Sequence, residues 1–190
     1  NAHNCKGSGQ CIFGCPTGAK QSVERNYLPL AIKAGAQILP QAKVHKINHQ
    51  AGVATSLDVH LLNEQAKCVK QIKVRAQKII LACGTLESPL LLMRSSLGSY
   101  SGQLGRNLSI HPTAKMMGLF EEDINGDFGV PQGYGIDAFE NQGMMFESVF
   151  FPPWLLATST FHSGDAHWQI MKNYKKIGIF GFLVSDDSRG

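Results

Sequence analysis

The chain has 190 residues, of which 43% are hydrophobic and 17% charged, a composition that excludes a disordered or a collagen-like protein. Its 18 basic and 14 acidic residues give a formal net charge of +4. The basic side chains are scattered along the sequence, which argues against nucleic acid as a partner. No run approaches the roughly 18 apolar residues of a membrane span. The sequence does not decide between a cytoplasmic and a periplasmic location.

A loop rich in glycine and cysteine is predicted for residues 3–18, which show no hydrophobic period. It carries Cys5, Cys11 and Cys15, and an odd total of five cysteines does not fit a secreted disulfide framework. Three thiolates followed by a proline are typical of iron–sulfur ligation. With His3 as a fourth ligand they also suit zinc. The third interpretation, that they are ordinary side chains of a loop, stays open beside these two.

A short helix and then an antiparallel meander are predicted beyond this loop. Pro29 suits the first turn of the helix, and Gly35 suits the position just past its end. A strand around Val44 follows. Apolar and polar residues then alternate over residues 53–61, the period expected of a half-buried strand. A further strand covers residues 68–74, with the cysteine at its start expected in the core.

A strand of a different kind is predicted at residues 78–83, where a continuous apolar run indicates burial on both faces, as in a parallel sheet. Gly84 then allows a tight turn into a helix that has Ser88 as its N-cap and Pro89 as its first residue. We therefore expect Cys83 and Gly84 at the carboxyl end of a parallel strand that leads into a helix, with Cys83 buried. A glycine at such a turn lets a nucleotide approach the backbone closely.

The second half of the chain is predicted to be a separate domain that begins near residue 105. Its expected elements are strands at residues 113–120, 144–151 and 177–185 and a helix at residues 165–176. Between the first two strands, residues 123–143 form a long loop with five glycines. A loop of this length is uncommon unless it is functional or mobile. The fold class is α/β to α+β, with domains at residues 1–104 and 105–190.

Four segments, taken in order, resemble motifs of the glucose-methanol-choline (GMC) oxidoreductases. KIILACGTLESPLLLMRSSLG, residues 78–98, is similar to the family's second signature, with Ser96 where that signature has glycine. The other three are CIFGCPTGAKQS at 11–22, NYLPLAIKAGA at 26–36 and GRNLSIHP at 105–112. The closing residues 186–190 also resemble the start of a family segment. Four ordered motifs of different composition rarely coincide.

The resemblance implies an enzyme with an FAD-binding domain, made of an antiparallel meander and a parallel strand, and a substrate domain built on an antiparallel sheet. The residue matching Val44 typically contacts the adenine end of FAD through its backbone. Cys83 and Gly84 match a strand end that lies near the dinucleotide. The spacing of Cys5, Cys11 and Cys15 resembles that of sugar dehydrogenases of the family, which implies a 3Fe-4S cluster.

Two family features have no match in this sequence. The G-x-G-x-x-G turn that binds the FAD pyrophosphate is missing, because Gly7, Gly9 and Gly14 have the wrong spacing. The family's catalytic histidine lies near the C-terminus of the complete enzyme, so His111 is expected to be structural and no residue here is assigned as catalytic. We therefore expect the chain alone to be inactive and to bind no FAD.

The implied function is oxidation of an alcohol group by hydride transfer to the flavin of the complete protein. The alcohol is a sterol, a long-chain alcohol, a sugar or a polyol. Oxygen, a quinone or a cytochrome accepts the electrons. The alternative from a different class is a stand-alone iron–sulfur electron-transfer or interaction module without flavin. A flavin enzyme explains the meander and the turn at Gly84, which an electron carrier does not need.

Overall fold

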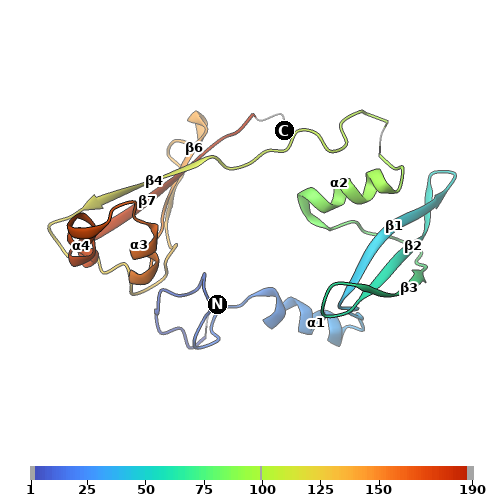
Figure 1. Ribbon diagram of the computed structural model, residues 1–190, viewed down its shortest axis with the longest axis horizontal. Coiled ribbons are helices and arrows are strands. Elements are labelled where there is room, and N and C mark those ends of the chain that lie inside the picture. The colour runs from blue at the N-terminus through green and yellow to red at the C-terminus, as the bar shows by residue number, and fades with distance from the viewer. Residues whose placement is uncertain (1–2, 99, 188–190) are drawn as a thin grey trace. The chain divides into compact units, whose positions relative to one another are not determined.

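The structure is a computed structural model, and it describes residues 3–98 and 100–187. The chain forms two compact units, of which one joins the segment up to Ala31 with His111–Asp186 and the other runs from Ile32 to Ile110. Each unit combines helices with an antiparallel sheet, which confirms the mixed fold class (Figure 1). The functional division near residue 105 stays a prediction. Residues 188–190 of the closing segment lie outside the described residues.

The unit from Ile32 to Ile110 contains the expected meander. Its strands are β1 (Ala42–Gln50), β2 (Val53–Leu62) and β3 (Cys68–Val74), paired antiparallel in the order β1-β2-β3. The hairpin between β1 and β2 turns at Ala51 and Gly52, whose φ angles are 49° and 78°. Positive φ at both loop residues is the geometry that matches the twist of two-residue hairpins. Local turn chemistry therefore sets the register of this sheet.

The first helix also lies where the sequence predicts it. A short 3-10 helix, η1 (Val23–Arg25), precedes α1 (Tyr27–Lys33). Pro29 falls in the first turn of α1, where its missing N–H costs no helical hydrogen bond. Gly35 has a φ of +95°, and its N–H donates to the Ile32 carbonyl at 2.9 Å. A glycine just past the last turn thus ends the helix, as expected.

The parallel strand expected at residues 78–83 is not formed. The chain leaves β3 at Val74 and stays irregular until α2 (Gly84–Arg94) begins. Ile80, the middle of the apolar run, is 89% exposed. A strand buried on both faces needs a neighbouring strand and covering helices. The described residues place no strand beside this segment, so Ile80 and Ala82 stay exposed and Ile79 and Leu81 are only half-buried.

The helix after this segment begins five residues earlier than predicted. Gly84 is its first residue and Cys83 its cap, while Pro89 lies inside the helix. Ser88 is therefore not the N-cap. Its hydroxyl oxygen instead accepts a hydrogen bond from the Cys83 N–H at 3.1 Å. Ser88 thus binds the backbone of the capping residue from a position inside the helix.

The other unit is built on a second antiparallel sheet. Its strands are β4 (Thr113–Leu119), β5 (Gly135–Ile136), β6 (Met144–Ser148) and β7 (Ile177–Val184), in the order β4-β7-β6-β5. Three of these confirm predicted strands. β5 lies inside the predicted long loop, which is thus partly ordered by pairing with β6. Figure 1 shows β4, β7 and β6 running side by side.

Helices beside this sheet complete the unit. They are η2 (Glu140–Gln142), α3 (Pro153–Ser159), α4 (Gly164–Lys172) and η3 (Tyr174–Lys176). α4 and η3 together cover the predicted helix, whereas α3 was not predicted, although a proline at the first helical position is a known start signal. The buried core consists of Val149, Leu156, Ile177 and Ile179. Among the described residues, no helix has the length and apolarity needed to cross a membrane.

Candidate functional site

Val44, the residue expected to contact adenine, lies in the outer strand of the meander. It is half-buried and pairs with Val59 of β2. The register shifts between Val44 and Lys46, which makes His45 a bulged residue. A bulge bends a strand and re-aims the residues beside it. No further strand pairs with the free edge of β1 in the described sheet.

A buried serine fixes α2 against this edge. Ser95 is fully buried, and its hydroxyl oxygen accepts the Ile47 N–H at 2.8 Å while its hydroxyl donates to the Leu91 carbonyl at 2.7 Å. The neighbouring Arg94 donates from Nη1 to the His45 carbonyl at 3.3 Å. Because β1 is an edge strand, the Ile47 N–H has no neighbouring strand to bond with, and the Ser95 hydroxyl takes that place. The strand that carries Val44 and the helix that begins at Gly84 therefore belong to one body.

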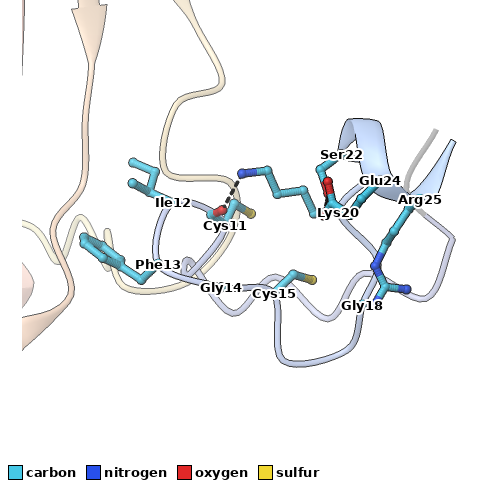
Figure 2. Close-up of a pocket in the computed structure, with 10 residues that line it drawn as sticks. All are labelled: Cys11, Ile12, Phe13, Gly14, Cys15, Gly18, Lys20, Ser22, Glu24 and Arg25. Atoms are coloured by element: carbon cyan, nitrogen blue, oxygen red, sulfur yellow. Dashed lines mark hydrogen bonds between the residues drawn. The ribbon is translucent and has the colours of Figure 1, made fainter. Parts of the chain in front are cut away.

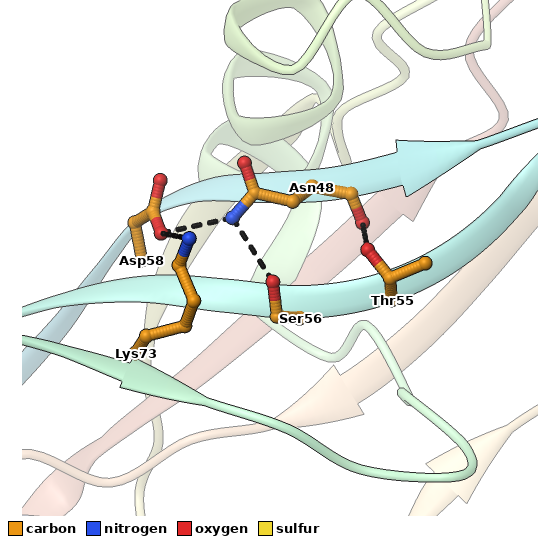
Figure 3. Close-up of polar contacts among 5 residues, drawn as sticks. All are labelled: Asn48, Thr55, Ser56, Asp58 and Lys73. Atoms are coloured by element: carbon orange, nitrogen blue, oxygen red, sulfur yellow. Dashed lines mark hydrogen bonds and ion pairs between the residues drawn. The ribbon is translucent and has the colours of Figure 1, made fainter.

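Polar side chains tie the three strands of the meander together (Figure 3). The Asn48 side-chain amide donates to Asp58 Oδ1 at 2.8 Å and to Ser56 Oγ at 3.2 Å. Asp58 also pairs with Lys73 of β3, with 3.8 Å between Oδ1 and Nζ. The ion pair is largely exposed, so it adds little stability by itself. The network specifies which strands pair and so positions β1.

Cys83 and Gly84 cap and begin α2, whereas the sequence predicted them at the end of a parallel strand; an irregular segment precedes them instead. Gly84 has a φ of +81°, and no atom lies within 4 Å of the place that a Cβ would take. The backbone at this turn is therefore open to a ligand that needs close approach. Cys83 is exposed, which corrects the expectation that it is buried, because no sheet forms there to cover it.

Cys11 and Cys15 line an open pocket of about 360 Å³ in the N-terminal loop (Figure 2). The Sγ of Cys15 accepts the Ala19 N–H at 3.2 Å and lies 3.6 Å from the Thr17 hydroxyl. The Thr17 hydroxyl first, and then backbone N–H groups led by that of Lys20, lower the pKa of Cys15 from 9.0 to about 7. Lys20 closes the loop by donating from Nζ to the Cys11 carbonyl at 2.9 Å.

The structure does not gather the cysteines into a metal site. Over residues 3–98 and 100–187, no group of three or more His, Cys, Asp or Glu side chains is placed to hold a metal ion. Cys5 does not line the pocket, and its sulfur accepts the Gly7 N–H at 3.5 Å. The expected set of Cys5, Cys11 and Cys15, with or without His3, is therefore not assembled, and neither iron–sulfur nor zinc ligation is supported.

The prediction for Cys68 is wrong, and the prediction for His111 stays open. Cys68 is exposed, not in the core, because it opens β3, an edge strand with little burial. His111 lies in an exposed irregular segment, and its structural role stays a prediction. Sequence reasoning missed Ser95, whose role depends on a partner 48 residues away. It also missed Thr17, because a linear motif does not show which side chains turn back on a sulfur.

Comparison with known protein families decides the family. The model of the GMC oxidoreductases matches residues 1–113. The chain belongs to the GMC oxidoreductase family. An uncharacterized GMC-type oxidoreductase of Mycobacterium tuberculosis, MT0511/MT0512, is 34% identical over 191 residues, which is 100% of this chain and 29% of the relative. The chain thus spans about 29% of the first curated relatives it matches.

Other GMC relatives carry names that state an activity. The long-chain-alcohol oxidase FAO1 of Arabidopsis thaliana is 32% identical over 63% of this chain and 16% of its own length. A cholesterol oxidase of Acinetobacter baumannii is 26% identical over 70% of this chain and 25% of its own length. Among solved structures, pyridoxine 4-oxidase from Mesorbium loti has a TM-score of 0.44 and 17% identity, covering 75% of this chain and 29% of that chain.

Proposed function

We propose that the full-length GMC protein is an FAD-dependent enzyme that oxidises an alcohol group by hydride transfer. Membership of the family carries this proposal, since the family model matches more than half of the chain. The flavin, when bound, accepts the hydride. The proposed role of the residues in this chain is to bind and orient the FAD. None of them is proposed as the catalytic base.

In this proposal Val44, Cys83 and Gly84 contact the adenosine part of FAD. The open backbone at Gly84 supports it, because a side chain at this position has no protein neighbour and projects into free space. The bulge beside Val44 supports it as well, since it interrupts the regular edge of β1. Because the sequence has no G-x-G-x-x-G turn, we propose that residues 1–190 alone do not retain FAD.

The proposed substrate is an apolar alcohol, either a long-chain alcohol or a sterol. Support comes from relatives named long-chain-alcohol oxidase and cholesterol oxidase, which match 63% and 70% of this chain. Neither of these two relatives is named for a sugar or a polyol. The substrate domain is proposed to be built on the β4-β7-β6-β5 sheet.

A substrate screen on the purified full-length protein tests this function. We expect a yellow protein whose flavin absorbance is bleached without oxygen by a long-chain alcohol or a sterol, and less by glucose or sorbitol. Oxygen and an artificial dye then serve as alternative acceptors to distinguish an oxidase from a dehydrogenase. A protein that purifies without flavin, and gains none when FAD is added, contradicts the proposal.

A further inference from the structure

The N-terminal loop places two thiols on one accessible pocket. Cys11 and Cys15 are free and half-buried, and both line the pocket of about 360 Å³. Figure 2 shows both side chains at this opening, together with Lys20 and Arg25. The other cysteines of the described residues do not line it. The two free thiols are four residues apart in sequence, and one small molecule in the pocket can reach both. Together they make a candidate dithiol site.

The surroundings of Cys15 favour the thiolate, the reactive form of cysteine. Its sulfur accepts the Ala19 N–H and lies beside the Thr17 hydroxyl, as described above. The charged groups that line the pocket are Lys20, Arg25 and Glu24. The Glu24 carboxylate is held by the Ser22 hydroxyl, and two cations outnumber it. Thiolates held in electropositive, accessible places are the ones that react with oxidants.

We propose that Cys15 and Cys11 form a peroxide-reactive thiol pair in which Cys15 is oxidised first and Cys11 then closes a disulfide. The Cys15 thiolate attacks hydrogen peroxide, an S–O bond forms, the O–O bond breaks, and hydroxide leaves with the electron pair. The Cys11 thiolate attacks the resulting sulfenic acid, an S–S bond forms and a second hydroxide leaves. The thiol pair loses two electrons and the peroxide gains them. This site is independent of the proposed alcohol oxidation.

Because both cysteines are free, closing a disulfide requires the turn between them to shift. Gly14 directly precedes Cys15, and no atom lies within 4 Å of its Cβ position. The turn itself is held by two hydrogen bonds, from the N–H groups of Phe13 and Gly14 to the Gln10 carbonyl. Closing the disulfide carries Phe13 along, whose ring packs edge-on against Trp154 with 4.8 Å between centroids. Trp154 emission therefore reports the reaction.

Peroxide treatment of the reduced, intact protein at pH 7, followed by alkylation and peptide mass spectrometry, tests the pair. We expect a Cys11–Cys15 cross-linked peptide, lighter by two hydrogen atoms, before Cys68 or Cys83 is modified. Cys68 is the internal control, because it is more exposed than Cys15 and its sulfur donates to the Lys70 carbonyl, at 3.6 Å. Oxidation of Cys68 ahead of Cys15, or a mixture in which Cys11 and Cys15 never cross-link, overturns the proposal.

The expected difference in reaction rate follows from the fraction of each thiol that is ionised. At pH 7 a thiol of pKa about 7 is roughly half ionised and one of pKa 9.0 only about one per cent, and lower intrinsic nucleophilicity cancels part of this gain. We expect Cys15 to react several-fold faster than a thiol without this shift, and ahead of Cys68. Thr17→Val, which removes the hydroxyl beside the sulfur, slows Cys15 several-fold. Thr17→Ser keeps the hydroxyl and the rate.

Single cysteine variants separate the two roles. In Cys11→Ser, a sulfenic acid on Cys15 persists and is trapped by dimedone, whereas Cys15→Ser leaves Cys11 slow to react. The Trp168→Phe background isolates Trp154, whose emission changes on oxidation of the wild-type pair and not in Cys11→Ser. Trapping on Cys11 instead of Cys15, or no sulfenic acid in Cys11→Ser while Cys68 is oxidised, contradicts the assigned order.

Discussion

Ser96 has a left-handed backbone conformation, which favours glycine. Its φ is +57°, and it follows the last residues of α2. The Leu97 N–H donates to the Leu92 carbonyl at 2.9 Å, and the Ser96 N–H to the Met93 carbonyl at 3.0 Å. This hydrogen-bond pair is the Schellman motif, in which glycine usually takes the left-handed position. The family signature has glycine where this chain has Ser96, and the structure keeps the turn that glycine would make.

Ser96→Gly is therefore expected to stabilise the unit that contains α2. Removing the Cβ from a left-handed position relieves backbone strain, and the extra freedom of glycine in the unfolded chain returns part of that gain. We expect about 0.5–1 kcal/mol in the free energy of unfolding. Urea unfolding followed by circular dichroism measures it. Ser96→Ala keeps the Cβ and should give no such gain; equal stabilisation by both changes would show that the φ angle is not the cause.

Ser95 is expected to be the most sensitive polar residue of the same unit. Ser95→Ala leaves the buried Ile47 N–H without an acceptor, at a cost of about 1–3 kcal/mol. Hydrogen exchange of the Ile47 amide should become much faster. Ser101→Ala is the matched control, since its hydroxyl accepts the exposed Gln103 N–H. Unchanged protection of Ile47 in Ser95→Ala would mean that α2 does not hold β1.

Tyr174 makes the other unit sensitive to high pH. Burial, and after it the negative charge of Asp127, raises the pKa of Tyr174 from 10.0 to about 12. The folded state thus favours the neutral phenol, which donates to the Phe151 carbonyl at 2.7 Å. Its contribution to stability is complete below pH 10 and is lost as the pH rises through 12.

An ultraviolet titration of the phenolate tests this. We expect a phenolate phase near pH 12 that vanishes in Tyr174→Phe and persists in Tyr100→Phe. If Tyr174→Phe keeps the phase, the buried phenol has been misassigned. Tyr174→Phe is also expected to flatten the loss of stability between pH 10 and 12.

At the scale of elements, the cysteine loop is joined to the long loop of the same unit. Residues 8 and 129 form a parallel bridge, with the Gly9 N–H donating to the Gly129 carbonyl at 3.1 Å and the Gly129 N–H to the Gly7 carbonyl at 2.7 Å. Gly9 has a φ of +67°, and a Cβ there would lie 3.0 Å from the Asp127 carbonyl oxygen. The bridge therefore requires a residue without a side chain at this position.

Gly9→Ala is expected to open the bridge, because the positive φ strains an alanine and because its Cβ would crowd the Asp127 carbonyl oxygen. Limited proteolysis should then cut within residues 3–18 at least several-fold faster. Gly14→Ala is the control, because its φ is also positive, at 140°, but its Cβ position is empty. Equal cleavage of the two variants would mean that backbone strain alone, and not the bridge, protects the loop.

The elements also show why some predictions succeeded. The meander follows from the alternation over residues 53–61 and from the turn residues beside it, which act over a few neighbours. The strand expected at residues 78–83 failed because an apolar run forms a strand only where other strands pair with it. α3 was not predicted, although Pro153 is its first helical residue and proline is favoured at that position.

At the scale of the whole molecule, the four ordered motifs predict the family, and the family model confirms it over residues 1–113. Ordered motifs carry this information because each reflects a local requirement. The cysteine ligand set could not be decided in this way, since ligation depends on how three sulfurs converge in space. The same limit applies to Ser95 and Thr17, whose partners are set by tertiary structure or loop conformation.

FAD affinity of the full-length protein with Gly84→Ala tests the central claim most directly. Gly35→Ala is the matched control, because both glycines have positive φ, +81° and +95°, and neither Cβ position has a neighbour within 4 Å. Both changes carry similar backbone strain. We predict that Gly84→Ala weakens FAD binding by about tenfold or more, about 1.4 kcal/mol, whereas Gly35→Ala leaves it unchanged. Equal FAD affinity of the two variants would contradict contact between the turn at Gly84 and the flavin nucleotide.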